Sequence, residues 1–299
     1  MQPPSAAPAV TTMPARGDLR GAVWMLGAVA SFTVMALSVR SLAATLSVYQ
    51  ILFLRSAVGL PLLVAVVLAM RGREGLRLFR TANLKLQAVR NAMHIFGQLG
   101  WIYAITVLPF ALVFAIEFTT PLWAVLLAAL VLGEHPSRPQ QLGLAIGLAG
   151  ILVIVRPGPA GISWDLLVIL GAALAFAGTF LGTRVLGRTD PPVAIPFWMC
   201  VLQTPPGLVL ALTDWRPVTL AHVPTVLLIA AGGLAAHQCM SMALRLAPIA
   251  RVLPVDYLRL PLIAVVGALF YAEPFDPFVL IGGAVVLAGV LVSQLKRRS

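Results

Sequence analysis

The chain has 299 residues, of which 60% are hydrophobic and only 10% charged, and its formal net charge is +11. A soluble domain carries about 25% charged residues, so this chain has more apolar side chain than an aqueous core can bury, and lipid must be its solvent. A basic charge would also suit nucleic acid, but the basic residues lie in short clusters between apolar runs and not on a face with interleaved aromatics. No nucleic-acid partner is therefore expected.

The N-terminal residues 1–18 are rich in Pro, Ala and Thr and predict a disordered cytoplasmic tail. This tail lacks the apolar run of a signal peptide, so the first span is expected to stay as an anchor. Cys200 and Cys239 both fall inside apolar runs, and the chain has no CxxC motif. Neither a disulfide framework, nor a metal site, nor a cofactor is expected.

Ten apolar runs follow, each near the roughly 20 residues that a helix needs to cross the hydrocarbon. They lie near 20–41, 48–70, 86–107, 109–132, 139–156, 163–186, 192–212, 219–244, 248–270 and 277–295. With a cytoplasmic N-terminus, most Lys and Arg fall on the inner side, and only Arg40, Arg156 and Arg216 lie at the outer loops and span ends. The positive-inside rule thus predicts a multi-pass protein of the inner membrane with both termini in the cytoplasm.

One pattern occurs twice, 139 residues apart. LGEHPSRPQQLGLAIGLAG (132–150) carries Glu134, Gly143 and Gly150, and YAEPFDPFVLIGGAVVLAG (271–289) carries Glu and Gly at the matching places. Each repeat holds five spans, and five is odd, so the second repeat must enter the membrane from the opposite side. The prediction is an all-α integral membrane protein whose ten transmembrane helices form two inverted five-helix repeats, 19–158 and 159–299. Such repeats are typical of transporters that alternate between two open states.

The stretches PLWAVLLAALVLGEHPSRPQQLGLAIGLAGILVIVRPG (121–158) and PLIAVVGALFYAEPFDPFVLIGGAVVLAGVLV (261–292) resemble the two EamA-type repeats of the drug/metabolite transporter superfamily. This resemblance implies ten helices, cytoplasmic termini and transport by alternating access. It also implies a central cavity lined by spans 1, 3, 4, 6, 8 and 9, with spans 5 and 10 set aside. Members of the superfamily export amino acids and other small metabolites.

Ionisable residues inside spans indicate a candidate solute site, because a charge at the bilayer centre costs roughly 2.5–3.5 kcal/mol on the insertion scale. Glu117 in span 4 and Asp256 in span 9 occupy matching depths. Arg259 shares a helical face with Asp256, so the two form either a self-neutralising pair or, through the Arg fork, a place for a substrate carboxylate.

A polar face on span 3 extends this site. Asn91, His94, Gln98 and Trp101 recur at helical spacing, and in span 8 His237 matches Gln98 across the repeat. Packing alone is the alternative role for these histidines, and a proton relay stays open. The residues expected to bind solute are His94, Gln98, Trp101, Glu117, His237, Ser241, Asp256, Tyr257 and Arg259.

Two prolines are expected to kink the spans that carry the acids. Pro121 cannot donate to the carbonyl of Glu117, and Pro261 cannot donate to that of Tyr257. A side chain such as Thr119 could bond the freed carbonyl. The kinks either shape the packing of the spans or, in the favoured interpretation, act as hinges.

These observations predict a secondary transporter, most simply an exporter of amino acids or related small molecules. A passive facilitator or exchanger and a multidrug-type efflux protein are alternatives on the same scaffold. A membrane enzyme is disfavoured, since the sequence has no Walker A loop, GxSxG or HExxH motif. The solute, the direction of flow, proton coupling and a homodimer stay open.

Overall fold

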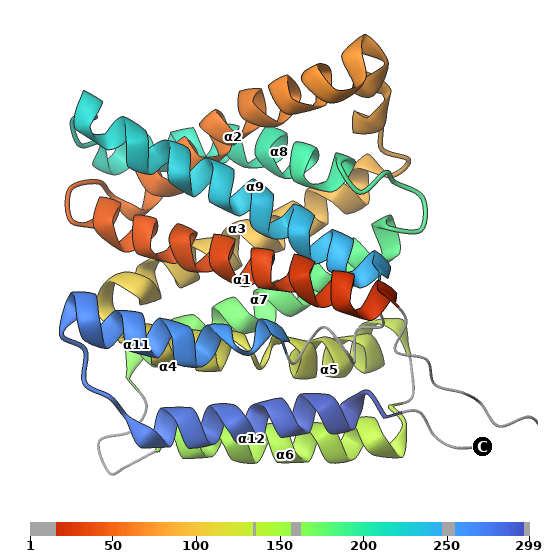
Figure 1. Cartoon of the computed structure of the whole chain (residues 1–299), viewed down its shortest axis with the longest axis vertical. Helices are drawn as coiled ribbons and strands as arrows, with labels where there is room; N and C mark the ends of the chain where they lie inside the picture. Colours follow the sequence, from red (N-terminus) through yellow and green to blue (C-terminus); the bar gives the residue numbers. More distant parts are fainter. Residues whose placement is uncertain (1–15, 134–135, 157–162, 247–254, 296–299) are drawn as a thin grey trace, which may run out of the picture.

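The computed structural model describes residues 16–133, 136–156, 163–246 and 255–295 (Figure 1). Throughout these ranges the regular structure is helical, which confirms the predicted all-α class. Of the predicted tail, residues 1–15 lie outside the described ranges, and the first helix begins earlier than expected, at Arg16.

The first half of the chain supplies α1 (Arg16–Ala43), α2 (Val48–Arg71), α3 (Leu84–Val107), α4 (Phe110–Glu117), α5 (Thr120–Leu132) and α6 (Arg138–Val155). A 3-10 segment, η1 (Gly72–Phe79), follows α2, and α4 with α5 forms the predicted fourth span. The capping box of Ser137 and Gln140 at the start of α6 confirms the helix start expected there.

The second half supplies α7 (Trp164–Leu186), α8 (Ala194–Ala211), α9 (Val223–Leu246), α11 (Arg259–Tyr271) and α12 (Pro277–Ser293), with short 3-10 turns η2 (Leu212–Asp214) and η3 (Leu220–His222). Asp276 caps α12 by accepting from Phe278 N at 2.9 Å, which also confirms a predicted helix start. The predicted span 248–270 falls partly outside the described residues.

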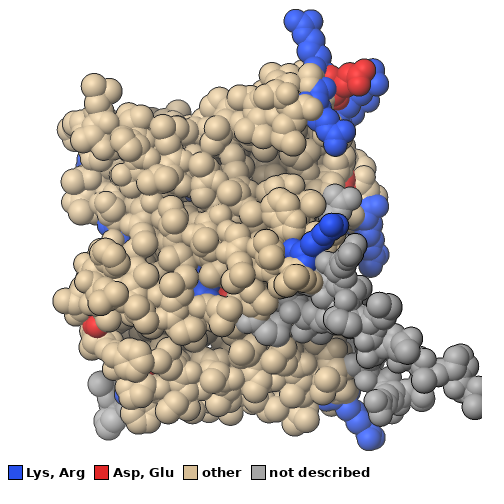
Figure 2. Space-filling model, in the orientation of Figure 1, with Lys and Arg blue, Asp and Glu red and all other residues tan. Residues whose placement is uncertain are grey.

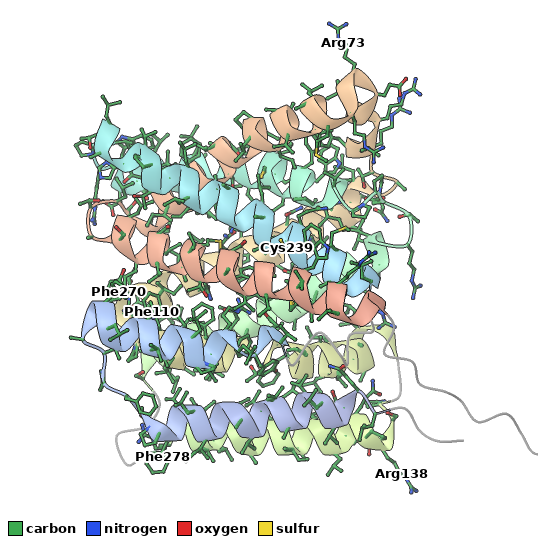
Figure 3. The ribbon with its side chains drawn as sticks, viewed as in Figure 1. Arg73, Phe110, Arg138, Cys239, Phe270 and Phe278 are labelled. Atoms are coloured by element: carbon green, nitrogen blue, oxygen red, sulfur yellow. The ribbon has the colours of Figure 1, made fainter. Side chains whose placement is uncertain are left out.

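Seven helical segments of the described chain are long and apolar enough to cross a membrane, and α11 and α12 are shorter apolar helices. Helix α3 is long enough but less apolar, because it carries the predicted polar face. The helices run side by side, and α1 begins on the side where α12 ends (Figure 1). Lys and Arg gather on that side, with Arg73 and Arg138 projecting from it (Figures 2 and 3). We call it the basic side.

Helix packing follows the inverted repeat. Helix α1 packs along α9, and its counterpart α7 packs along α3; α2 pairs with its own counterpart α8, and α6 pairs with α12. Such pairings are what two inverted repeats related by an approximate two-fold axis require. The α6–α12 pair lies at one end of the bundle, as expected for spans 5 and 10 (Figure 1).

The repeated glycines let α6 and α12 touch backbone to backbone. A Cβ at Gly143 would lie 2.4 Å from Gly289 O, and one at Gly150 would lie 2.8 Å from Gly282 O. Only glycine fits at such separations, so the glycines serve packing within the chain.

The expected break beside Glu117 is present, since α4 ends at Glu117 and α5 begins at Thr120. The carbonyl freed by Pro121 accepts from Thr120 Oγ1 at 2.6 Å. Thr119, the residue suggested from the sequence, bonds the carbonyl of Ile116 instead. Both threonines bond the carbonyl three residues before them, so the hydroxyl that reaches Glu117 is that of Thr120, the first residue of α5, and not that of Thr119 on the turn.

On the side opposite the basic side, Arg40 and Glu273 form a joint between helix ends. The two side chains form an ion pair, and Arg40 also donates to Ile105 O at 2.6 Å and to Leu108 O at 2.5 Å. Glu273 Oε2 accepts from Phe110 N at 2.8 Å. The joint ties the ends of α1, α3, α4 and α11 together.

Candidate functional site

Two acids from different halves share one arginine in the interior. Arg259 Nη1 lies 3.4 Å from Glu117 Oε1, and Arg259 Nη2 lies 3.3 Å from Asp256 Oδ2. Trp101 Nε1 donates to Glu117 Oε2 at 2.7 Å. We call Trp101, Glu117, Asp256 and Arg259 the acid–arginine cluster. It joins α3 and α4 of the first repeat to α11 and the turn before it, so Asp256 and Arg259 are more than a self-neutralising pair.

Aromatic rings hold the Arg259 guanidinium in place. Its Cζ lies 4.6 Å from the ring centre of Phe32, 4.9 Å from that of Phe118 and 5.1 Å from that of Phe114. Tyr257 stacks on Phe118 at 4.4 Å and donates its hydroxyl to Phe118 O at 2.9 Å. Cation–π attraction therefore supplements the two acids. Tyr257 therefore packs against one of the rings around Arg259, and its hydroxyl already donates to a backbone carbonyl.

Two polar atoms in this cluster, Asp256 Oδ1 and Arg259 Nε, are buried without a hydrogen-bond partner in the described chain, and Arg259 Nη1 has only its ion-pair contact with Glu117 at 3.4 Å. Arg259 is 3% exposed. A buried, unpartnered polar atom typically costs about 1–3 kcal/mol, and more when it belongs to a charged group. A ligand site has this property, because polar atoms that bind the ligand are left without partners when the site is empty.

The two predicted histidines face each other between α3 and α9. Their ring centres are 6.4 Å apart. His94 Nδ1 lies 2.9 Å from Gln203 Nε2 on α8, which makes Nδ1 the acceptor. His237 meets the ring of Phe32 edge-on at 5.7 Å. Because Phe32 also covers Arg259, His237 and Phe32 separate His94 from the acid–arginine cluster.

A second polar cluster surrounds His94 and contains residues that sequence reasoning did not assign to the site. Arg90 donates to Thr183 Oγ1 at 3.1 Å and to Asn91 Oδ1 at 3.0 Å, and Gln203 Nε2 lies 3.5 Å from Asn91 Oδ1. With its amide oxygen turned toward Arg55, Gln98 accepts from that guanidinium and donates to Gln203 Oε1 at 3.1 Å. We call Arg55, Arg90, Asn91, Gln98 and Gln203 the arginine–amide cluster.

The nine predicted site residues therefore fall into distinct groups. Trp101, Glu117, Asp256, Tyr257 and Arg259 come together, whereas His94 and Gln98 belong with the arginine–amide cluster and His237 lies between. Ser241 is on α9, but its side chain lies outside the described part of the chain. Arg55 and Arg90 were not assigned to the site from the sequence, although both are arginines inside spans with no acid one helical turn away, a pattern that indicates a partner elsewhere. Within the described ranges no group of His, Cys, Asp or Glu side chains could hold a metal ion.

Comparison with known proteins agrees with a transporter. The riboflavin transporter of Brucella anthropi is 33% identical over 207 residues, which cover 67% of this chain and 72% of that protein. The pseudopaline exporter of Pseudomonas aeruginosa is 28% identical over 286 residues, covering 94% of this chain and 99% of the exporter.

A protein crystal structure with 17% sequence identity has the same fold, with a TM-score of 0.63 over 92% of this chain and 96% of that one. The model of the EamA-like transporter family matches twice, at residues 19–156 and 163–294, once for each repeat. The chain is not an enzyme but a multi-pass membrane transporter of small molecules, and it belongs to the EamA-like transporter family.

Proposed function

We propose that this chain is a secondary transporter that moves a small polar metabolite by alternating access, and that the acid–arginine cluster binds the solute. The observation that carries the proposal is that Asp256 Oδ1 and Arg259 Nε, buried where the two repeats meet, have no hydrogen-bond partner among the described residues. A solute with complementary donors and acceptors would satisfy these atoms and remove the cost of burying them.

The position of the cluster supplies a mechanism for coupling binding to movement. Glu117 belongs to one repeat, and Asp256 and Arg259 belong to the other, so the contacts between them change when the repeats rock against each other. The backbone break beside Glu117 lets α4 and α5 move separately. A solute ammonium at the two acids would compete with Arg259 and favour one arrangement of the repeats over the other.

We further propose that the basic side faces the cytoplasm and that the protein lies in the inner membrane, since the basic residues on that side follow the positive-inside rule. Export of amino acids stays a prediction. Riboflavin is a second candidate solute, because a relative 33% identical to this chain is a riboflavin transporter.

Counterflow into proteoliposomes tests the proposal. Vesicles loaded with an unlabelled amino acid or with riboflavin should accumulate the labelled compound transiently, because trans-solute accelerates exchange only in a carrier. Glu117→Gln should reduce the initial rate at low solute at least tenfold, equivalent to losing about 1.4 kcal/mol of a charge-assisted hydrogen bond. Arg259→Ala should reduce it similarly.

The matched control is Arg156→Gln, which removes a charge from an ion pair with Asp276 that is half exposed. If Glu117→Gln and Arg259→Ala fold normally and exchange solute as fast as this control, the acid–arginine cluster is not the binding site. Transport without counterflow would instead identify a passive channel.

A further inference from the structure

We propose that the arginine–amide cluster binds an anionic group, a carboxylate or a phosphate, carried by the transported solute. This inference deepens the proposed function, on which it rests, by naming the chemical class of the solute. The cluster is built from α2, α3 and α8, on the other side of Phe32 and His237 from the acid–arginine cluster.

The first reason is unbalanced charge. Arg55 is 6% exposed and Arg90 is 4% exposed. In the described chain the ion pairs involve other arginines, and the hydrogen-bond partners of Arg55 and Arg90 are neutral amides, a hydroxyl and a thioether. Both guanidiniums belong to one hydrogen-bond network, because Gln98 accepts from Arg55 and Gln203 links Gln98 to Asn91, which accepts from Arg90. Buried like charges of this kind call for an anion between or beside them.

The second reason is unused donor capacity. Nη2 of Arg55 faces the Sδ atom of Met199 at 3.5 Å, and a thioether is only a weak acceptor. Nη2 of Arg90 has no hydrogen bond to the described residues. On α9, a Cβ at Gly233 would lie 4.0 Å from Arg55 Cζ, so the guanidinium faces a position with no side chain. Guanidinium forks match carboxylate and phosphate oxygens.

The third reason is complementarity between the two clusters. The acid–arginine cluster holds two carboxyls against one guanidinium, which suits the positive end of a solute. The arginine–amide cluster holds two guanidiniums and no carboxyl among its described members, which suits the negative end. His94 and His237, with ring centres 6.4 Å apart, lie between these opposite charges. Only a solute whose amine and oxyanion are several bonds apart would engage both clusters at once, and a smaller solute would use them one at a time.

Calorimetric titration of the purified full chain, in neutral detergent without added phospholipid, tests this with matched probes. L-Phenylalanine and phenethylamine differ by a carboxylate, and riboflavin 5′-phosphate and riboflavin differ by a phosphate. In at least one pair the wild type should bind the anionic member at least about tenfold more tightly. The double variant Arg55→Gln/Arg90→Gln should lose that preference, whereas Arg156→Gln should keep it.

Melting of the ligand-free protein separates a binding role from a structural one. Removing two buried, unbalanced charges should leave the melting temperature unchanged or raise it, whereas a structural role would lower it. If the double variant does not fold, Arg90→Gln alone and Arg55→Lys provide the same comparison, and a reduced preference in either supports the site.

The inference is overturned if the folded double variant keeps the anion preference, or if the wild type shows none in either pair. Mass spectrometry that found a phospholipid bound to the wild type and missing from the double variant would assign the cluster to a lipid headgroup instead. Failure of the proposed function is separate: it is read from counterflow of Glu117→Gln, which leaves the arginine–amide cluster intact.

Discussion

With the proposed alternating access, the joint between Arg40 and Glu273 predicts how the side opposite the basic side opens. Glu273 accepts charge-assisted hydrogen bonds from the Arg40 guanidinium and from Phe110 N. Glu273→Gln keeps the shape but removes the negative charge, and because its amide has only one acceptor oxygen, it can accept from Arg40 or from Phe110 N but not from both, at a total loss of about 2 kcal/mol. A loss of about 2 kcal/mol should raise the population open on this side about 30-fold.

Cysteine labelling measures that population. Ala36 is fully buried and lies one helical turn from Arg40 on α1, behind the joint. In a background of Cys200→Ser and Cys239→Ser, Ala36→Cys should react with an impermeant maleimide, applied from the side opposite the basic side, about 30-fold faster when Glu273→Gln is added.

A neighbouring ion pair provides the control. Asp276→Asn weakens the half-exposed Arg156–Asp276 pair but keeps a helix-capping residue, so the labelling rate should change by less than about fivefold. If the labelling rates of Ala36→Cys were equal with Glu273→Gln and with Asp276→Asn, and both variants were folded, the joint between Arg40 and Glu273 would not control access from this side.

Two further predictions concern stability. Gly143→Ala should lower the melting temperature of the purified protein, because it forces α6 and α12 apart at a cost of about 1–3 kcal/mol. Gly171→Ala, where nothing lies within 4 Å of the new Cβ, should raise the melting temperature instead. The reverse order of melting temperatures would contradict the packing argument. Asp190 lies in the loop before α8, where burial alone would raise its pKa, but hydrogen bonds from Thr81, Ala82 N, Gln87 and Thr189 lower it below the usual 3.8. The contribution of Asp190 to stability is therefore present above about pH 3.8 and lost as the pH falls through the lowered pKa. Asp190→Asn should melt at a lower temperature than wild type at pH 6, and this difference in melting temperature should narrow in acid. A difference that does not change with pH would refute this.

The sequence predicted the scaffold because the bilayer leaves few alternatives. Apolar runs of sufficient length must be helices there, and an odd number of spans per repeat forces the inversion. The break at Pro121 and the contact between Gly143 and Gly289 follow equally from local chemistry, since proline removes a donor and glycine removes a side chain.

The contents of the site were less predictable because they depend on contacts between distant segments. Trp101 and Glu117 were both expected at the site, but their hydrogen bond depends on how α3 packs on α4. Arg55 and Arg90 lie inside apolar runs in the sequence, and their shared surroundings appear only when α2, α3 and α8 are assembled. A rule that every arginine inside a span needs a named partner would have drawn attention to both.

The repeat itself separates scaffold from site. Where the two halves carry the same residue, the contacts are structural: Gly143 matches Gly282, Gly150 matches Gly289, and all four hold α6 against α12. These pairs keep their identity because the two-fold packing uses each position twice.

The arginine–amide cluster departs from this symmetry. Phe53 of the first repeat aligns with Phe197 of the second, and this register pairs Arg55 with Met199. The register that aligns Gln98 with His237 pairs Arg90 with Ile229 and His94 with Gly233. Arg55 touches its own counterpart Met199 and faces Gly233, so these unlike pairs meet near the two-fold axis. A buried charge on one side of the two-fold axis costs free energy and does not improve the symmetric packing of the two repeats. The asymmetry is therefore what an asymmetric, charged solute would require, and a variant that restores symmetry with Arg55→Met should keep the fold and lose the preference for the anion.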